Sequence, residues 1–409
     1  MSTKAGPLSH VRVLDLSRIL AAPWAGQTLA DLGADVIKVE RPGSGDDTRG
    51  WGPPYLRDAQ GQETRESAYY LTANRGKRSI TLSLDKPEAQ QIVRDLAMRS
   101  DIVLENYKAG TLARYGLDAE SLRKLNPRLI YCSVTGFGQT GPRRDQPAYD
   151  FLIQAMGGLM SVTGERDGRP GGGPQKVGVP IVDLMTGMYA AVAVLAALAR
   201  RNETGLGETI DIGMLDVQVA ALSNQAMNYL ISERVPARNG NAHPNIQPQD
   251  VYACADGDVI LVVGNDGQFS KLCEVLGQEA WTQDERFALN AQRVRNISIL
   301  APLLRERLLT WKRETLIQAL DTAGVPCGPI NSVAEVFQDA QVLSRELLRK
   351  VPHPCGVDVP QVANPMRFGG AALSMPAAPP QLGAHSEAIL AELGYNSADM
   401  AMLRAEKVI

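Results

Sequence analysis

VRVLDLSRILAAPWAGQTLADLGADVIKVE, residues 11–40 of the 409-residue chain, predicts a strand, a helix and a second strand in that order. Val11–Leu16 is an apolar run of strand length, and Ala25–Leu32 has the composition of a helix that ends before Gly33. Asp35–Val39 is the next apolar run of strand length. A strand, a covering helix and another strand form the repeating unit of a parallel sheet.

The same alternation continues along the chain. A clear amphipathic helix is predicted over Pro87–Arg99, and further strands are predicted over Ser79–Leu82, Ile102–Leu104, Leu129–Val134 and Thr209–Ile212. This pattern predicts an α/β fold with a parallel sheet whose two faces are covered. Because 409 residues exceed what one core usually supports, we expect a large domain in residues 1–225, a smaller α/β domain in residues 226–332, and a return to the large domain in residues 333–409.

The composition is that of a soluble globular protein, with 44% hydrophobic and 21% charged residues. The formal net charge of −3, with basic residues scattered along the chain, argues against nucleic-acid and membrane-surface binding. The longest apolar run, Leu184–Ala199, is shorter than a bilayer span and predicts a buried helix. Residues 1–7 contain no apolar signal core, and the five cysteines are dispersed, so we expect a cytoplasmic protein. The four histidines lack ligand spacing, which predicts no metal site.

The loop after the first predicted strand argues against a dinucleotide site. Residues 17–24 read SRILAAPW, which lacks the GxGxxG pattern that brings backbone amides against a pyrophosphate. Glu40 ends the second strand where a ribose-binding acid would stand, but without the glycine loop we predict no NAD binding. The chain also lacks the GxxxxGK[ST] phosphate loop and the GxSxG nucleophile elbow.

Asp183 is the candidate catalytic residue. It is a lone carboxylate in the apolar, small-residue segment VGVPIVDLMTGMYA, residues 177–190. Gly178 and Pro180 break regular structure before it, and residues 186–200 then have helical length. Asp183 is therefore predicted at or near the N-terminus of a buried helix, where unpaired amides stabilise a carboxylate. It is either the N-cap of that helix or a nucleophile held in a dry pocket.

Several motifs stand in order around this segment: VLDLSRILAAP at 13–23, LGADVIKVERPG at 32–43, NRGKRSI at 74–80, ENY at 105–107 and GVPCGPIN at 324–331. In this order and spacing, the chain resembles the class III coenzyme A transferase family, which includes the formyl-CoA and carnitine CoA-transferases. The resemblance extends over essentially the whole chain.

The resemblance implies a Rossmann-like large domain and a smaller domain, in two subunits that interlock as a homodimer. It implies that Asp183 is the covalent nucleophile, whereas Asp150 and Glu40 have structural or supporting roles. It also implies that an acyl-CoA thioester and a free carboxylic acid are the substrates, with no tightly bound cofactor and no metal. Carboxylate attack on a thioester gives a mixed anhydride, and attack of the released thiolate gives an enzyme–CoA thioester.

The CoA contacts are carried over position by position from the resemblance. They are Ile19, Leu20, Arg41, Leu82, Asn106, Tyr107 and Arg114, with Lys77 and Arg78 as further candidates for phosphate contact. Leu20 departs from the formyl-CoA transferases, which have glutamine there. Their tetraglycine lid also has no counterpart in this chain, so oxalate and formate chemistry is not expected.

The substrate is predicted from the dicarboxylate branch of the family, which includes the succinyl-CoA:glutarate CoA-transferases. The segments that carry this resemblance are GDDTRGWGPP at 45–54, GNAH at 240–243 and GNDGQF at 264–269. A dicarboxylate needs a cation for its distal carboxylate, and arginine provides bidentate pairing. The candidates are Arg18, Arg49 and Arg75, with His243 as a polar neighbour.

Two other functions compete with CoA transfer. The 2-methylacyl-CoA racemases share the fold, but their histidine falls at Tyr149 here, and tyrosine is a poor base at neutral pH. A non-catalytic CoA-binding protein is the other alternative. Detection of a covalent CoA adduct separates it from a transferase.

Overall fold

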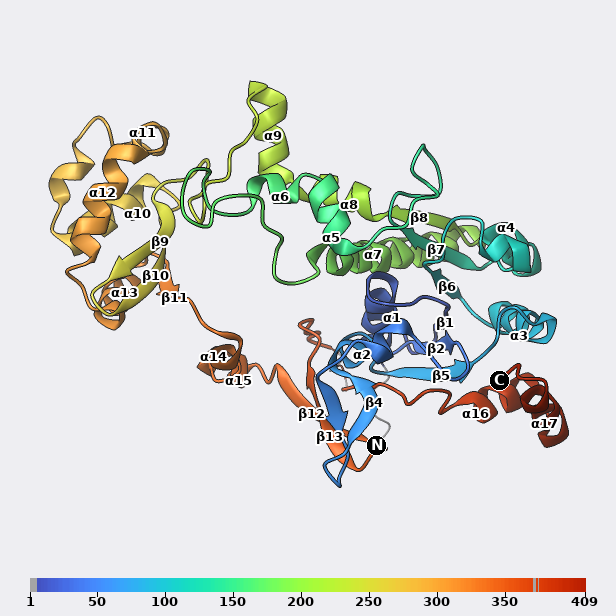
Figure 1. Cartoon of the computed structure of the whole chain (residues 1–409). Coiled ribbons are helices and arrows are strands. Elements are labelled where there is room, and N and C mark those ends of the chain that lie inside the picture. The colour runs from blue at the N-terminus through green and yellow to red at the C-terminus, as the bar shows by residue number, and fades with distance from the viewer. Residues whose placement is uncertain (1–5, 371–372, 374) are drawn as a thin grey trace. The chain divides into compact units, whose positions relative to one another are not determined.

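The computed structural model describes residues 6–370, 373 and 375–409 (Figure 1). The chain divides into two compact units. Unit 1 comprises the described residues up to Gly158, Gly178–Ser223 and Gln341–Ile409, and unit 2 comprises Leu159–Val177 and Asn224–Ala340.

The division differs from the predicted domains mainly in one segment. Residues 159–177 were expected in the large domain, but they pack within unit 2. The Gly240 N–H donates to the Gly164 carbonyl at 3.1 Å, and Arg238 Nη1 donates to the Ser161 carbonyl at 3.2 Å. A glycine-rich loop has few apolar residues of its own, so its backbone partners decide where it packs, and the sequence does not show them.

Unit 1 contains a six-stranded sheet in the order β5-β2-β1-β6-β7-β8, and every neighbouring pair is parallel. This confirms the predicted parallel α/β sheet. The order is that of a doubly wound sheet, in which ligands bind where the strand order reverses, here between β1 and β6. The strands are β1 (Arg12–Asp15), β2 (Asp35–Glu40), β5 (Lys77–Thr81), β6 (Ile102–Glu105), β7 (Ile130–Thr135) and β8 (Thr209–Gly213).

Helices cover both faces of this sheet (Figure 1). Successive strand residues enter opposite cores, so Val13 packs on the side of α1 and α7 while Leu14 packs on the side of α3 and the C-terminal helices. Burial on both faces explains why the strands read as continuous apolar runs rather than alternating ones. The helices of unit 1 are α1 (Ala21–Asp31), α2 (Ala68–Thr72), α3 (Pro87–Met98), α4 (Ala119–Leu125), α5 (Asp150–Met156), α7 (Ile181–Thr204), α8 (Met214–Ala221), α16 (Ser386–Leu393) and α17 (Ser397–Ala405).

Two hairpins of unit 1 were not predicted. They are β3 (Tyr55–Arg57) with β4 (Glu63–Ser67), and β12 (Leu348–His353) with β13 (Val357–Val362). Short 3-10 helices also occur at η1 (Asp47–Gly50) and η2 (Leu112–Tyr115). Residues 214–232 contain no glycine or proline and have the composition of one long helix, but they form two helices, because Ser223 adopts a left-handed conformation with φ of 48° after α8.

Unit 2 has its own core around an antiparallel sheet in the order β11-β10-β9. Val259 and Leu261 of β10 pack against apolar residues of its helices, such as Phe269 and Leu304. The elements are α6 (Leu159–Val162), α9 (Ser223–Ser232), β9 (Gln249–Cys254), β10 (Gly257–Val262), α10 (Asp266–Leu276), η3 (Glu279–Thr282), α11 (Asn290–Arg295), α12 (Ile297–Leu308), α13 (Arg313–Ala323), β11 (Cys327–Pro329) and α14 (Val333–Val336). The short helix α15 (Ala340–Ser344) begins at the last residue of unit 2 and otherwise belongs to unit 1.

Within the described part of the chain, α7 alone has the length and composition to cross a membrane, with a hydropathy of 2.0. The core helix of a soluble protein passes the same test. α7 packs on α1 and on β7, and two charged residues, Asp183 and Arg201, are buried along it.

Candidate active site

Asp183 lies in the first turn of α7, as the sequence predicted, and only 9% of the residue is exposed. Burial strips water from its carboxylate, and the negative charge of Asp150 repels the ionised form. Together these effects raise the pKa of Asp183 to about 7. The carboxylate is therefore more basic than an ordinary aspartate, which strengthens it as a nucleophile and leaves it largely ionised only above neutral pH.

The N-cap interpretation of Asp183 does not hold, because another carboxylate binds the amides of this turn. Asp150, the first residue of α5, accepts hydrogen bonds from the Val182 N–H at 2.8 Å and from the Asp183 N–H at 3.3 Å. The N-cap position itself is Pro180, which provides no side-chain cap. Among residues 6–370, 373 and 375–409, no side chain or backbone group donates a hydrogen bond to the Asp183 carboxylate, which leaves it for another role.

Tyr69 is a site residue that the sequence did not reveal. Burial, followed by the negative charges of Asp183 and Asp150, raises the pKa of the Tyr69 phenol to about 12, so the hydroxyl stays protonated at neutral pH. The ring packs edge-to-face on Trp51, with 5.1 Å between ring centroids. No local motif marks Tyr69, because α2 is a five-residue helix whose proximity to Asp183 is purely tertiary.

A close helix crossing fixes the position of Asp183 relative to the loop after β1. Gly187 lies one turn after Asp183, and a Cβ atom at this position would approach the Ala21 carbonyl oxygen to 2.4 Å. Only glycine allows such a close approach between α7 and the start of α1. The loop that precedes α1 contains Arg18, Ile19 and Leu20, so the crossing holds the candidate nucleophile beside the predicted CoA-binding loop.

Three predicted residues meet at the carboxyl ends of β1 and β6. The Arg18 N–H donates to Asn106 Oδ1 at 2.8 Å, and Asn106 Nδ2 donates to the Arg18 carbonyl at 2.6 Å. The Arg18 guanidinium also lies over the Tyr107 ring, 5.3 Å from its centroid. These contacts join the two loops at the point where the strand order reverses, which is where doubly wound sheets bind ligands.

A carboxylate in the loop after β2 joins this group to Arg41. Asp47 pairs with Arg18 at 2.9 Å and with Arg41 at 2.6 Å. The Ile19 N–H contacts the neighbouring Asp46 carboxylate at 3.2 Å, and Ile19 has a left-handed backbone with φ of 72°. The Arg41 side chain is 52% exposed, so it can bind an anion while it remains paired with Asp47.

Three other predicted CoA contacts lie apart from this group or are buried. Leu82 is fully buried in the core beneath α3, where its side chain has no exposed surface. Leu20 is also buried and stands immediately before α1. Arg114 is exposed on η2, and within residues 6–370, 373 and 375–409 it forms no ion pair.

The buried arginines proposed for substrate binding are already paired. Arg49 contacts Glu40 at 2.7 Å and Glu66 at 2.9 Å, and each of the three side chains is at most 5% exposed. Arg75 forms a bidentate pair with Asp31 at 2.7 and 2.6 Å. A substrate carboxylate would have to displace these partners, which makes Arg18 the most accessible of the three candidate cations.

The further phosphate candidates are paired in the same way. Lys77 contacts Asp15 at 2.8 Å, and burial lowers the pKa of Lys77 to about 8 even though Asp15 opposes the shift. Arg78 is only partly buried and pairs with Asp35 at 2.7 Å and with Glu392 at 2.6 Å. Both side chains contribute to the fold at the end of the sheet.

His243 belongs to unit 2 and is held in one tautomer. Its Nδ1 accepts the Asn245 N–H at 3.0 Å and the Ile246 N–H at 3.1 Å, so the ring proton is on Nε2. The Gln247 side chain donates to the His243 carbonyl at 2.6 Å, which fixes the loop. The ring can therefore donate one hydrogen bond from Nε2.

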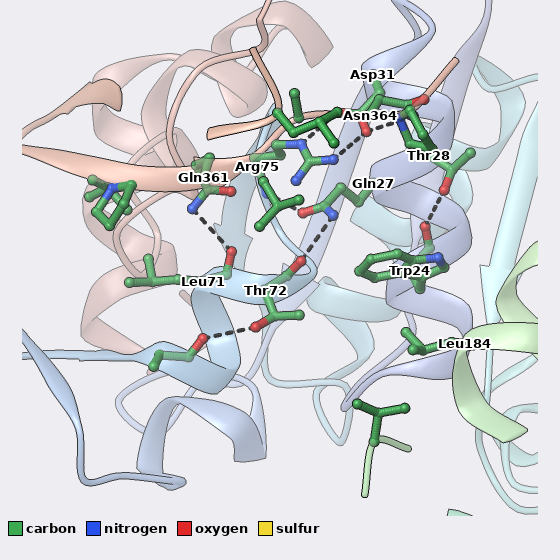
Figure 2. A pocket seen from close by; sticks show the side chains of 18 of the residues that line it. Trp24, Gln27, Thr28, Asp31, Leu71, Thr72, Arg75, Leu184, Gln361 and Asn364 are labelled. Atoms are coloured by element: carbon green, nitrogen blue, oxygen red, sulfur yellow. Dashed lines mark hydrogen bonds and ion pairs between the residues drawn. The ribbon is translucent and has the colours of Figure 1, made fainter. Parts of the chain in front are cut away.

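A cavity of about 1140 Å³ lies in unit 1 between α1, the start of α7 and the strand β13 (Figure 2). Trp24 and Leu184 contribute to its apolar lining, and Leu184 directly follows Asp183 in the chain. The polar groups on its wall are satisfied, since Arg75 pairs with Asp31, and Gln27 donates to the Thr72 carbonyl at 2.9 Å (Figure 2). The stretch of α7 that directly follows Asp183 thus faces a cavity whose wall is largely apolar.

In residues 6–370, 373 and 375–409, no group of three or more histidine, cysteine, aspartate or glutamate side chains is placed to hold a metal ion. The negative charge of Asp150 acts on the Asp183 carboxylate, and both charges act on the Tyr69 phenol. A buried carboxylate with a raised pKa can act as a nucleophile.

Comparison with known proteins gives a consistent result. A family model described as CoA-transferase family III matches residues 8–386. The chain is 50% identical over 393 residues to the succinate–glutarate CoA-transferase of Agrobacterium fabrum, covering 96% of this chain and 97% of that protein. It is 40% identical over 404 residues to the succinyl-CoA:glutarate CoA-transferase of Mus musculus, covering 98% of this chain and 90% of that protein. A crystal structure of a CAIB/BAIF family protein from Brucella suis matches with a TM-score of 0.82 and 49% identity, covering 95% of this chain and 100% of that chain.

Proposed function

The chain belongs to CoA-transferase family III, and on this premise we propose that it transfers coenzyme A from succinyl-CoA to a C4–C6 dicarboxylate such as glutarate, with Asp183 as covalent nucleophile. One observation carries the choice of nucleophile. Asp183 is a buried carboxylate at the start of α7 whose helix-capping role is taken by Asp150. A buried carboxylate with a raised pKa that does not cap its helix is a candidate for a chemical role, which supports the proposal.

The proposed reaction balances in four steps. The Asp183 carboxylate attacks the thioester carbonyl, the C–S bond breaks, and the thiolate of CoA leaves with the electron pair. The thiolate then attacks the Asp183 carbonyl of the mixed anhydride and expels succinate. The acceptor carboxylate attacks the resulting Asp183–CoA thioester, and the thiolate finally attacks the acceptor carbonyl and restores Asp183. Both covalent states hydrolyse if water enters, and the burial of Asp183 limits access of water to them, which supports the proposal.

The CoA portion is proposed to lie along the loops after β1, β2 and β6. Arg41 is the exposed cation for a phosphate group, and the Arg18–Asn106 contact orders the loop that approaches Asp183. Ile19 and Tyr107 provide apolar surface for the pantetheine arm. Leu82 and Leu20 are buried and would contribute through the backbone that they position.

For the distal carboxylate of a dicarboxylate we propose Arg18. Its guanidinium is about one-third exposed, whereas Arg49 and Arg75 are buried in pairs with Glu40 and Asp31. The two named relatives support a dicarboxylate acceptor, because both act on succinate or succinyl-CoA and on glutarate by name.

We further propose that the protein is a homodimer in the cytoplasm, with the interlocked subunits that the resemblance implies. Unit 1 supports association, because Met188, Tyr189 and Val192 of α7 expose 42%, 47% and 61% of their surface on one helix. Large apolar side chains exposed together usually mark an interface. Mixing tagged and untagged protein tests this arrangement. We expect a dimer by light scattering and no subunit exchange without denaturant, and an active monomer would contradict it.

The function is tested by following CoA exchange with succinyl-CoA as donor. We expect glutarate to be a better acceptor than butyrate, and Asp183→Ala to abolish transfer while the melting temperature is retained. Arg18→Ala should lower kcat/KM for glutarate selectively. The loss corresponds to roughly 2–5 kcal/mol if the pair between Arg18 and the distal carboxylate is fully buried, and to less if water reaches that pair. Equal losses on glutarate and butyrate would place Arg18 in the CoA site, and normal turnover by Asp183→Ala would remove the mechanism.

A further inference from the structure

We propose that Asp150 is a positioning residue of the transfer reaction, which holds the first turn of α7 and destabilises the free Asp183 carboxylate relative to its covalent states. The inference rests on the proposed function. It explains why a second negative charge lies beside a nucleophile that is itself negatively charged.

The contacts of Asp150 define its charge and its hold on α7. Its carboxylate accepts hydrogen bonds from the Val182 N–H at 2.8 Å, the Asp183 N–H at 3.3 Å and Gln154 Nε2 at 2.6 Å. All three groups donate, and a side chain that only accepts hydrogen bonds is an ionised carboxylate. Asp150 is 9% exposed, so its charge is poorly screened by solvent. Because Asp150 binds two backbone amides in the first turn of α7, a displacement of Asp150 would also displace the backbone of Asp183.

No cation offsets the two carboxylates within residues 6–370, 373 and 375–409. Helix α7 packs on α1, α5 and α8, and the charges of Asp183 and Asp150 both raise the pKa of Tyr69 in α2. The tyrosine is neutral at working pH. Of the other acids on these helices, Asp31 of α1 pairs with Arg75, and the carboxylate of Asp216 in α8 lies beside Gly213. The repulsion between Asp150 and Asp183 therefore persists as long as Asp183 is ionised.

Acylation removes this repulsion. When the Asp183 oxygen attacks the thioester carbonyl, the new C–O bond converts the carboxylate into a neutral anhydride, and the negative charge leaves on the CoA sulfur. The following Asp183–CoA thioester is neutral as well. Because Asp150 raises the free energy of only the ionised state, it favours both covalent states and makes the free carboxylate a stronger nucleophile.

The charge state of Asp183 is consistent with this assignment. Burial is the larger cause of its raised pKa and the charge of Asp150 is the second, and together they bring that pKa to about 7. At pH values below 7 a growing fraction of the enzyme holds a protonated, inactive Asp183. The position of the acid limb in the pH profile of kcat/KM for succinyl-CoA therefore measures how strongly the charge of Asp150 acts on Asp183.

The test compares Asp150→Asn with the parent enzyme. The amide oxygen can still accept the Val182 N–H, but the charge is lost. We expect the acid limb to move to lower pH by about one unit, as removal of a nearby like charge does. The fraction of enzyme recovered with CoA on Asp183 at a fixed succinyl-CoA concentration should fall several-fold. A purely structural role would lower activity without moving the acid limb.

Asp211→Asn is the matched control, because Asp211 also accepts a backbone N–H, from Gln139 at 2.9 Å, but does not act on Asp183. The acid limb of the pH profile of Asp211→Asn should lie at the same pH as that of the parent enzyme. If Asp150→Asn does not fold, Asp150→Ser provides a second uncharged acceptor. An unmoved acid limb in a folded, uncharged variant overturns the inference and leaves the proposed function intact. Absence of any CoA adduct and of transfer in the parent enzyme would instead overturn the proposed function.

Discussion

Gly187→Ala tests whether the crossing of α7 and α1 positions the nucleophile. The new Cβ atom would lie 2.4 Å from the Ala21 carbonyl oxygen and 3.0 Å from Trp24 Cβ. The first distance is about 1 Å short of ordinary van der Waals contact, and the carbonyl belongs to a helix backbone that cannot rotate away. The first turn of α7 must therefore move away from α1.

Two opposing effects set the change in the free energy of unfolding. Replacing a helical glycine with alanine gains about 1 kcal/mol of helix propensity. Overpacking of a close contact costs typically about 1–3 kcal/mol. We expect a net destabilisation of roughly 0–2 kcal/mol, with a much larger loss of activity, because a displacement of about 1 Å can cost about 100-fold in rate.

The assays are urea unfolding and kcat/KM for CoA transfer. Gly267→Ala is the matched control, because Gly267 lies in α10, and its nearest neighbour to an added Cβ is Asn265 Oδ1 at 3.3 Å. The control should be as stable as the parent or more stable, with unchanged kcat/KM. If Gly187→Ala also retains parental activity, the close crossing does not position Asp183.

The remaining predictions concern charge. Arg41→Ala should raise KM for every acyl-CoA by about tenfold with little change in kcat, because the lost contact is to CoA and not to the reacting carbonyl. Steady-state kinetics with two different acyl-CoA donors test this expectation. Arg49→Met should destabilise the fold by about 3–5 kcal/mol in urea unfolding, because Glu40 and Glu66 are left buried and unpaired, while Arg57→Met in an exposed pair should cost under about 1 kcal/mol. Asp183→Asn should be more stable than the parent at pH 8 by about 1–4 kcal/mol and equally stable at pH 3.5. The raised pKa of Asp183 means that the folded parent binds more protons than the unfolded chain between pH 4 and 7 and so loses stability as pH rises. A constant difference across pH would show that the pKa of Asp183 is not raised.

The strands of the six-stranded parallel sheet and the place of Asp183 could be predicted, because local sequence pattern determines them. Strands buried on both faces read as apolar runs, and Gly178 and Pro180 delay the helix until just before Asp183. The break at Ser223 could not be predicted, because residues 214–232 have helical composition and no glycine or proline marks the left-handed residue.

The role of the arginines shows where sequence reasoning stops. Nothing local around Arg49 indicates that Glu40 and Glu66, from two other elements, converge on it. A buried structural arginine and a substrate-binding arginine have the same sequence signature. Tyr69 escaped notice for the same reason, because its relation to Asp183 exists only in three dimensions.

The covalent role of Asp183 is tested most directly with glutarate labelled with oxygen-18 in both carboxylates. In the proposed cycle, the acceptor oxygen that bridges the anhydride remains on Asp183 when the thiolate removes the acyl group. After many turnovers with succinyl-CoA, mass spectrometry of the peptide that contains Asp183 should show incorporated oxygen-18, and fragmentation should place the label on Asp183 and not on Asp150. Unlabelled Asp183 after many turnovers of glutaryl-CoA formation would contradict the account.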